Sequence, residues 1–334
     1  MNDPSEERSI ATGVEPSGAR PAARGGRTGS VALALAAAFG WATYYLFVLR
    51  GTPGTAPSAI LVYPFVVGGG AFALSAIVSG HGPAIAREWR SPSAYLRTTL
   101  MLGMQVSILA ATYLTGPVDA SLLSLIGDVV ATPLIIAALF AGPRASLGRP
   151  LFVLGLLLSL LGGSLAIVGG RRLSAVHGLG WLAVIAVPIA VGFYFILSAR
   201  ASESAPYSAV VGQSMLGAAL GALLIAPLIP GGWAGLVGMG PVLFALLAVN
   251  GLVSFFAAPT FYFLAIHREG IVVPSMLMTA IPIFTLLLSV GILGLALPWL
   301  GLLGIPIAVA GALLTLATVG ASSPSADRWA RPGR

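Results

Sequence analysis

Residues 120–140 read ASLLSLIGDVVATPLIIAALF, and this stretch indicates what kind of fold the chain adopts. As a helix it is long enough to cross the hydrocarbon core of a bilayer, which is about 30 Å thick. One carboxylate, Asp128, lies inside the stretch, and a helix-breaking proline, Pro133, follows five residues later. The stretch therefore predicts a membrane helix with a polar and interrupted centre.

The same apolar pattern recurs along the chain. Of the 334 residues, 57% are hydrophobic and 8% are charged, which is typical of an all-α protein that crosses a membrane many times. Long runs that are nearly free of charge predict ten spans. They cover residues 31–49, 58–79, 98–116, 120–141, 150–170, 178–199, 206–229, 241–266, 271–293 and 300–320. The last two come from one charge-free run that is too long for a single crossing, so a turn is expected within residues 294–299.

Arginine supplies every basic residue, and its distribution predicts the orientation of the chain. With a cytoplasmic amino terminus, only Arg50, Arg171 and Arg172 fall outside. Because cytoplasmic loops carry the excess of basic residues, both termini are expected in the cytoplasm. The same rule explains the net charge of +7 without a nucleic-acid partner. Residues 1–29 are expected to form a disordered cytoplasmic tail, and residues 321–334 a second tail.

Two residue types are missing from the chain, and their absence narrows the function. Without cysteine there is no disulfide and no cysteine metal site. Without lysine there is no ATP-binding loop of the lysine-containing kind, so energy has to come from a gradient or from substrate flow. We expect no cofactor. A composition rich in Ala, Gly, Arg and Pro points to a GC-rich bacterium, and hence to the bacterial inner membrane.

A duplication is visible when residues 113–165 are laid over residues 262–314 at a constant offset of 149. Several identical residues then fall in register, among them one tyrosine, one proline and three glycines. These pairs are Tyr113 and Tyr262, Pro133 and Pro282, Gly142 and Gly291, Gly155 and Gly304, and Gly162 and Gly311. We therefore expect two five-helix repeats, residues 30–173 and 174–320. Because five is odd, the second repeat enters the membrane in the opposite sense, which makes an inverted repeat.

These features resemble the drug/metabolite transporter superfamily, and specifically its EamA-like ten-helix transporters, over roughly residues 31–320. The resemblance rests on Trp41 early in the first span, ASLLSL and TPLI in the fourth, AIHREG and PSMLMTAIPIF around the start of the ninth, and the closing helices GLLLSLLGGSLAIVGG and GIPIAVAGALLTLA. It implies a central cavity lined by spans one, three, four, six, eight and nine, with spans five and ten as packing helices. The chain departs from the family pattern at Thr132, where a Glu is common.

Asp128 is the leading site candidate because it is the only acidic residue inside a predicted span. Ser121, Ser124 and Thr132 recur at helical spacing on its face. Pro133 would free the carbonyl of Val129, and Pro282 that of Met278 beside Thr279, so both prolines are candidate helix breaks. The remaining candidates are Trp41, Tyr44 and Tyr45 in span one, Asn250 in span eight, and Gln105 and Tyr194, which the implied cavity would admit.

Structural alternatives stay open for these candidates. Asp128 could be a structural carboxylate bonded to Ser or Thr, and the prolines could be packing kinks. Asn250, Gln105 and Gln213 could be interhelical hydrogen-bond glue. The aromatic residues of span one could equally face lipid or protein.

The sequence as a whole predicts a secondary transporter that exports small organic metabolites, such as amino acids or amphipathic drug-like compounds, by alternating access. Its partners are the substrate, the lipid bilayer and protons, with Asp128 as the candidate proton carrier. An uncoupled facilitator is the alternative, and a lipid scramblase or a non-transport subunit is a third possibility. An enzyme is not expected, because the spans hold no second carboxylate, no histidine at mid-membrane depth and no metal-ligand cluster. Monomer and homodimer both stay open.

Overall fold

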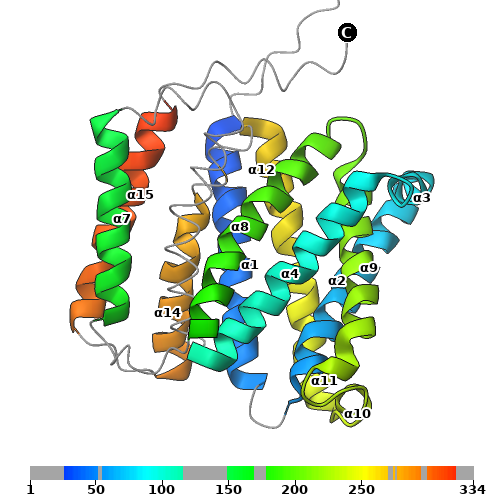
Figure 1. Cartoon of the computed structure of the whole chain (residues 1–334). Coiled ribbons are helices and arrows are strands. Elements are labelled where there is room, and N and C mark those ends of the chain that lie inside the picture. Colours follow the sequence, from blue (N-terminus) through cyan, green and yellow to red (C-terminus); the bar gives the residue numbers. More distant parts are fainter. Residues whose placement is uncertain are drawn as a thin grey trace, which may run out of the picture.

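The computed structural model describes residues 26–51, 55–115, 149–168, 178–269, 274, 277–294 and 299–320. All regular structure within these ranges is helical (Figure 1). The predicted all-α class is therefore confirmed for the described residues. The fourth predicted span, residues 120–141, lies outside them, as do residues 1–25 and 321–334. The count of ten helices and the complete inverted repeat stay predictions.

The other predicted spans coincide with helices, and short helices or helical turns lie between or within them. The α-helices are α1 (Gly26–Gly51), α2 (Pro57–Val78), α3 (Gly82–Glu88), α4 (Pro92–Thr115), α7 (Pro150–Val168), α8 (Gly178–Ala201), α9 (Tyr207–Ile225), α10 (Ala234–Val237), α11 (Pro241–Asn250), α12 (Ala258–Glu269), α14 (Ile281–Leu293) and α15 (Trp299–Gly320). Two 3-10 helices, η2 (Ala226–Leu228) and η4 (Met278–Ala280), and one π-helix, η3 (Gly251–Ala257), complete the described structure.

Three helical stretches in the described ranges are long and apolar enough to cross a membrane by themselves. These are Pro57–Val78, Tyr207–Leu228 and Pro241–Arg268. Proline begins several helices, for example α2 and α11, because the missing amide hydrogen of the first turn would have no partner in any case. Gly294 follows α14 with φ +63°, a conformation that glycine adopts without strain. Gly294 is the first residue of the predicted turn, residues 294–299, and residues 295–298 lie outside the described ranges.

The third span begins earlier than its sequence suggests. Helix α4 starts at Pro92, whereas the prediction started at residue 98 because Arg97 was assigned to a loop. In the structure, Arg97 lies inside α4 with a fully buried side chain. The short helix α3, which precedes α4, was not predicted either. Both differences arise because a buried ion pair lets charged residues lie inside the packed helices.

Helices α7 and α15 cross closely, and the crossing is reciprocal at the offset of 149 residues. The hydroxyl of Ser159 donates to the carbonyl of Ala308, the residue 149 positions later, at 3.3 Å. Gly155 lies against Gly311, and the equivalent pair, Gly162 and Gly304, is also in close contact. Small residues on both sides allow the two backbones to approach.

The two helices of this pair run in opposite directions. Arg149, just before α7, donates from Nη1 to the carbonyl of Thr318 near the end of α15, at 3.2 Å. Figure 1 shows α7 and α15 side by side at one edge of the molecule. An antiparallel pair with the same contacts in both directions has local two-fold symmetry.

The remaining described helices form a bundle with its core at the helix interfaces. Helix α2 packs against α9, α4 against α8, and α1 against α12 and α14. Helices α3 and α10 lie at opposite ends of this bundle (Figure 1). The side chains that join the helices are largely aromatic and alanine.

Candidate functional site

The structure describes five of the predicted site side chains: Trp41, Tyr44, Gln105, Tyr194 and Asn250. Asp128, Ser124, Thr132 and Pro133 lie outside the described residues, and so do the side chains of Tyr45, Thr279 and Pro282. The substrate roles assigned to all of these residues stay predictions.

Trp41 of α1 belongs to an aromatic cluster between three helices. Its ring centroid lies 5.6 Å from that of Phe195 on α8 and 5.4 Å from that of Tyr262 on α12. Phe195 and Tyr262 are 4.4 Å apart, and Tyr194 adjoins Phe195 at 5.4 Å. Trp41 therefore faces protein rather than lipid. The rings meet at steep angles, as aromatic pairs prefer, and they fill the space between α1, α8 and α12.

Tyr44 lies one turn further along α1 and faces a different set of rings. It packs against Phe255 of η3 at a centroid distance of 5.8 Å, and Phe255 packs against Phe65 of α2 at 5.0 Å. The Tyr44 side chain is buried. The two predicted aromatic residues are thus both inside the protein, but they contact different neighbours.

Asn250 ends α11 and leads directly into the π-helix η3. Its side chain is fully buried, and neither amide atom has a hydrogen-bond partner among the described residues. A buried amide without partners is costly, by roughly 1–3 kcal/mol for each unpaired group. Asn250 thus makes no interhelical hydrogen bond within the described residues. π-Helical turns are frequent at functional sites, where they redirect side chains.

The π-helix is held by close contacts with two other helices. Gly68 of α2 approaches Phe255 and Gly251, and Gly40 of α1 approaches Ala258. The hydroxyl of Ser254 donates to the carbonyl of Gly40 at 2.9 Å. Pro259, just after η3, has no amide hydrogen to return to the preceding turn, so a local change of helix geometry is expected there.

Gln105 of α4 resembles Asn250, whereas Gln213 of α9 does not. The Oε1 atom of Gln105 is buried without a partner among the described residues. Gln213 donates from Nε2 to the Thr98 hydroxyl on α4 at 3.2 Å, and its side chain is fully buried. Of the two glutamines, Gln213 behaves as the interhelical glue that the sequence allowed.

The helix break near Pro282 takes a different form from the one predicted. A 3-10 helix, Met278–Ala280, ends where α14 begins at Ile281. The amide of Ile281 donates to the carbonyl of Met278, so that carbonyl is not free, and the prediction that Pro282 releases it is wrong. The tighter 3-10 turn supplies a donor one residue earlier than an α-helix would.

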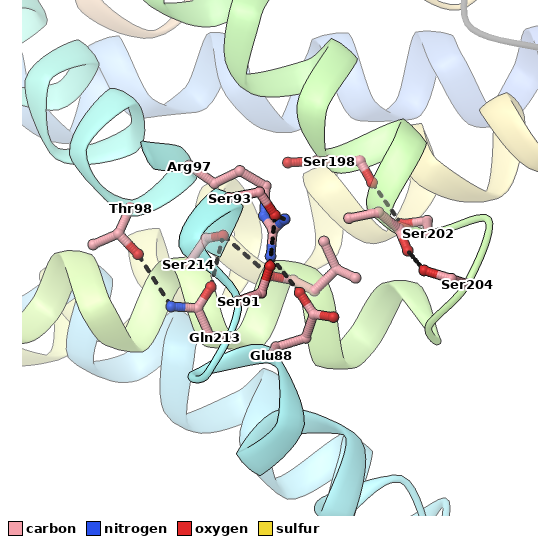
Figure 2. A network of polar contacts seen from close by, with 12 residues as sticks. Glu88, Ser91, Ser93, Arg97, Thr98, Ser198, Ser202, Ser204, Gln213 and Ser214 are labelled. Atoms are coloured by element: carbon pink, nitrogen blue, oxygen red, sulfur yellow. Dashed lines mark hydrogen bonds and ion pairs between the residues drawn. The ribbon is translucent and has the colours of Figure 1, made fainter. Parts of the chain in front are cut away.

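A polar network that the sequence did not reveal joins α3 to α4 and α4 to α9. Arg97 donates from Nη2 to the carboxylate of Glu88 and from Nη1 to the hydroxyl of Ser93, the latter at 3.0 Å. Figure 2 shows these contacts, with Ser198 on the neighbouring helix α8. The available signal was a pair of opposite charges nine residues apart, flanking the helix-starting proline of α4. It is weak, because the same pattern occurs in solvated loops.

Comparison with known proteins gives a match to one family model and matches to chains of solved structures. Residues 178–317 match the model of the EamA-like transporter family. A crystal structure of a protein with 20% sequence identity aligns with a TM-score of 0.66, covering 86% of this chain and 97% of that chain. At this identity the likeness concerns the fold alone. No curated protein matches the sequence.

Proposed function

Over residues 178–317 the chain belongs to the EamA-like transporter family, part of the drug/metabolite transporter superfamily, and on this premise we propose that it is a secondary transporter that exports small organic metabolites. The family and the apolar helices identify a multi-pass membrane transporter of small molecules. The proposal adds three statements. The protein exports its substrate, the substrate is an amino acid or an amphipathic drug-like compound, and the protein lies in a bacterial inner membrane.

The crossing of α7 and α15 carries this proposal. Ser159 and Ala308, which are equivalent at the offset of 149, touch each other, and the contacts around them are reciprocal. Antiparallel helices related in this way are what two inverted repeats produce at their common axis. Inverted repeats support alternating access, because exchanging the conformations of the two halves turns an inward-open protein into an outward-open one.

The pairing of the other helices supports the same two-fold relation. Between the proposed repeats 30–173 and 174–320, α1 corresponds to α8, and α4 corresponds to α12. The contact of α4 with α8 therefore has an equivalent in the contact of α12 with α1, and both contacts are present. Helices α2 and α9 correspond to each other, and they are also in contact. A substrate path along the axis would pass between α1, α4, α8 and α12, which carry Trp41, Gln105 and Tyr194.

Proton coupling is proposed through Asp128, on grounds of sequence alone. A carboxylate within a membrane span is costly unless it faces a cavity or a partner, and burial favours its protonated form. Asp128 would release a proton as it takes up a cationic or zwitterionic substrate. The paired prolines Pro133 and Pro282 are proposed to interrupt equivalent helices beside it.

The test compares wild type with Asp128→Asn in a bacterium that lacks its own efflux pumps. Toxic amino-acid analogues, amphipathic cations and dyes form the panel, and membrane abundance of the variants is matched. We expect wild type to confer resistance to one class and Asp128→Asn to lose it, whereas Glu203→Gln, at an exposed acid between α8 and α9, retains it. Equal resistance in Asp128→Asn would remove Asp128 from the mechanism and leave an uncoupled facilitator. No resistance and no flux of the panel compounds in liposomes would overturn export.

A further inference from the structure

The side chain of Arg97 is fully buried, yet its hydrogen-bonding capacity is not used up. Nη2 binds Glu88 and Nη1 binds Ser93, whereas Nε has no partner among the described residues. Leaving a charged donor buried and unpaired is costly, so such groups normally coordinate something. The free Nε–H lies on the side of the guanidinium that can form a fork with a carboxylate.

Two hydroxyl groups of α8 are also buried without a hydrogen-bond partner in the part of the chain that the structure describes. The oxygens of Tyr194 and Ser198 are both buried and have no partner among the described residues. The two residues are four positions apart on α8 and therefore lie on one face of the helix, and α8 packs against α4. The Tyr194 hydroxyl lies beside the hydroxyls of Ser198 and Ser214, without meeting either in hydrogen-bond geometry, and within electrostatic reach of Arg97. Three unused donors therefore gather between α4 and α8.

The polar groups that surround these three are paired. Ser202 donates to the carbonyl of Ser198 at 2.8 Å, and Ser214 donates to the carbonyl of Val210 at 3.1 Å. Gln213 donates to Thr98 (Figure 2). Within the described ranges, the donors without a hydrogen-bond partner are thus the Nε–H of Arg97 and the hydroxyls of Tyr194 and Ser198, and they are not spread through the network.

The chemistry of the three groups selects their ligand. A guanidinium N–H and two hydroxyls can all donate, and a carboxylate can accept several hydrogen bonds without needing to donate one. The positive charge of Arg97 is already balanced by Glu88, so a second carboxylate has to compete with Glu88 for it. Phe195, which adjoins Tyr194, and Trp41, which adjoins Phe195, make the surroundings of these groups apolar.

We propose that Arg97, Tyr194 and Ser198 form a binding site for the carboxylate of a small organic acid or zwitterion. Glu88 holds Arg97 until the ligand carboxylate takes its place. In the predicted orientation this site lies at the cytoplasmic end of α4 and α8, where an exported substrate would arrive first. Its place on a transport path rests on the proposed function, whereas its affinity for a carboxylate does not.

The test uses the purified full-length protein in detergent micelles, with benzoate as the probe and benzamide as its uncharged match. Binding is measured by titration calorimetry. We expect wild type to bind benzoate at least tenfold more tightly than benzamide. Tyr194→Phe and Ser198→Ala should each weaken benzoate binding by about tenfold, because each removes one hydrogen bond to a charged group. Tyr95→Phe, at an exposed tyrosine of α4, and Ser202→Ala should bind benzoate as wild type does.

Glu88→Gln separates a binding site from a purely structural network. Removing the competing carboxylate should tighten benzoate binding by roughly tenfold, whereas a network that only stabilises the fold would gain no affinity. Equal binding of benzoate and benzamide, unchanged affinity in Tyr194→Phe and Ser198→Ala, or no binding at all would overturn the site and leave a water-filled structural network. If benzoate binds as expected but the protein moves no substrate in liposomes, the site stands and the transport proposal fails.

Discussion

Replacing Asn250 by leucine is expected to stabilise the protein and to abolish transport. Both amide atoms of Asn250 are buried without partners among the described residues. If each unpaired atom costs about 1 kcal/mol, the low end of the usual range, an apolar side chain of similar volume removes about 2 kcal/mol of that cost. Transport is lost because the amide is proposed to contact the substrate. A binding site whose polar groups destabilise the empty protein is a common result of the trade-off between stability and activity.

The measurement is thermal unfolding of the full-length protein in detergent, together with flux in liposomes. Gln213→Leu is the matched control, because its amide is equally buried but bonded to Thr98 at 3.2 Å. It should be destabilised by about 1 kcal/mol, since it leaves the Thr98 hydroxyl without this partner. A melting temperature of Asn250→Leu below that of wild type would show that the buried amide does not destabilise the protein. A more stable Asn250→Leu that still transports would refute the role in transport alone.

Two further substitutions test the packing. Gly162→Ala places a Cβ 2.2 Å from the backbone nitrogen of Ala308, so it should lower the unfolding free energy by about 1–3 kcal/mol. Gly103→Ala, with open space around it, should leave stability unchanged or slightly raised. Equal melting temperatures of the two variants would contradict the close crossing. Phe195→Ala removes the centre of the aromatic cluster and should lower the unfolding free energy by about 3 kcal/mol. Phe193→Ala, at an exposed position of the same helix, should lower it far less. The opposite order of melting temperatures would show that the cluster does not stabilise the packing.

Much of the fold could be predicted because the membrane imposes simple rules on the sequence. A helix must be apolar for about 20 residues to cross, so the lengths of charge-free runs located the spans. A turn was expected within residues 294–299, and α14 ends just before Gly294. The offset of 149 was also visible in the sequence, because the same small residues are required wherever two equivalent helices cross closely. The EamA-like resemblance is confirmed over residues 178–317.

The candidate site could be predicted less well, because polar residues do not reveal their partners. Gln105 and Gln213 look alike in the sequence, yet one leaves its oxygen unpaired and the other bonds to Thr98. The carbonyl of Met278 was expected to be free, but a 3-10 turn satisfies it. Whether a hydrogen bond forms depends on distances of a few tenths of an ångström, and these are set by how helices pack rather than by which residues they contain.

From the sequence alone one can predict a set of apolar helices, the helix ends that carry arginine, and a second half that repeats the first. These properties follow from transfer of side chains into hydrocarbon and from spacing along the chain, and both are local. The burial of Arg97 against Glu88, in place of a solvated position in a loop, is visible only once the helices are packed together. A charge can enter the interior only when another part of the chain supplies its counter-charge, and that depends on the packing of α3 against the bundle.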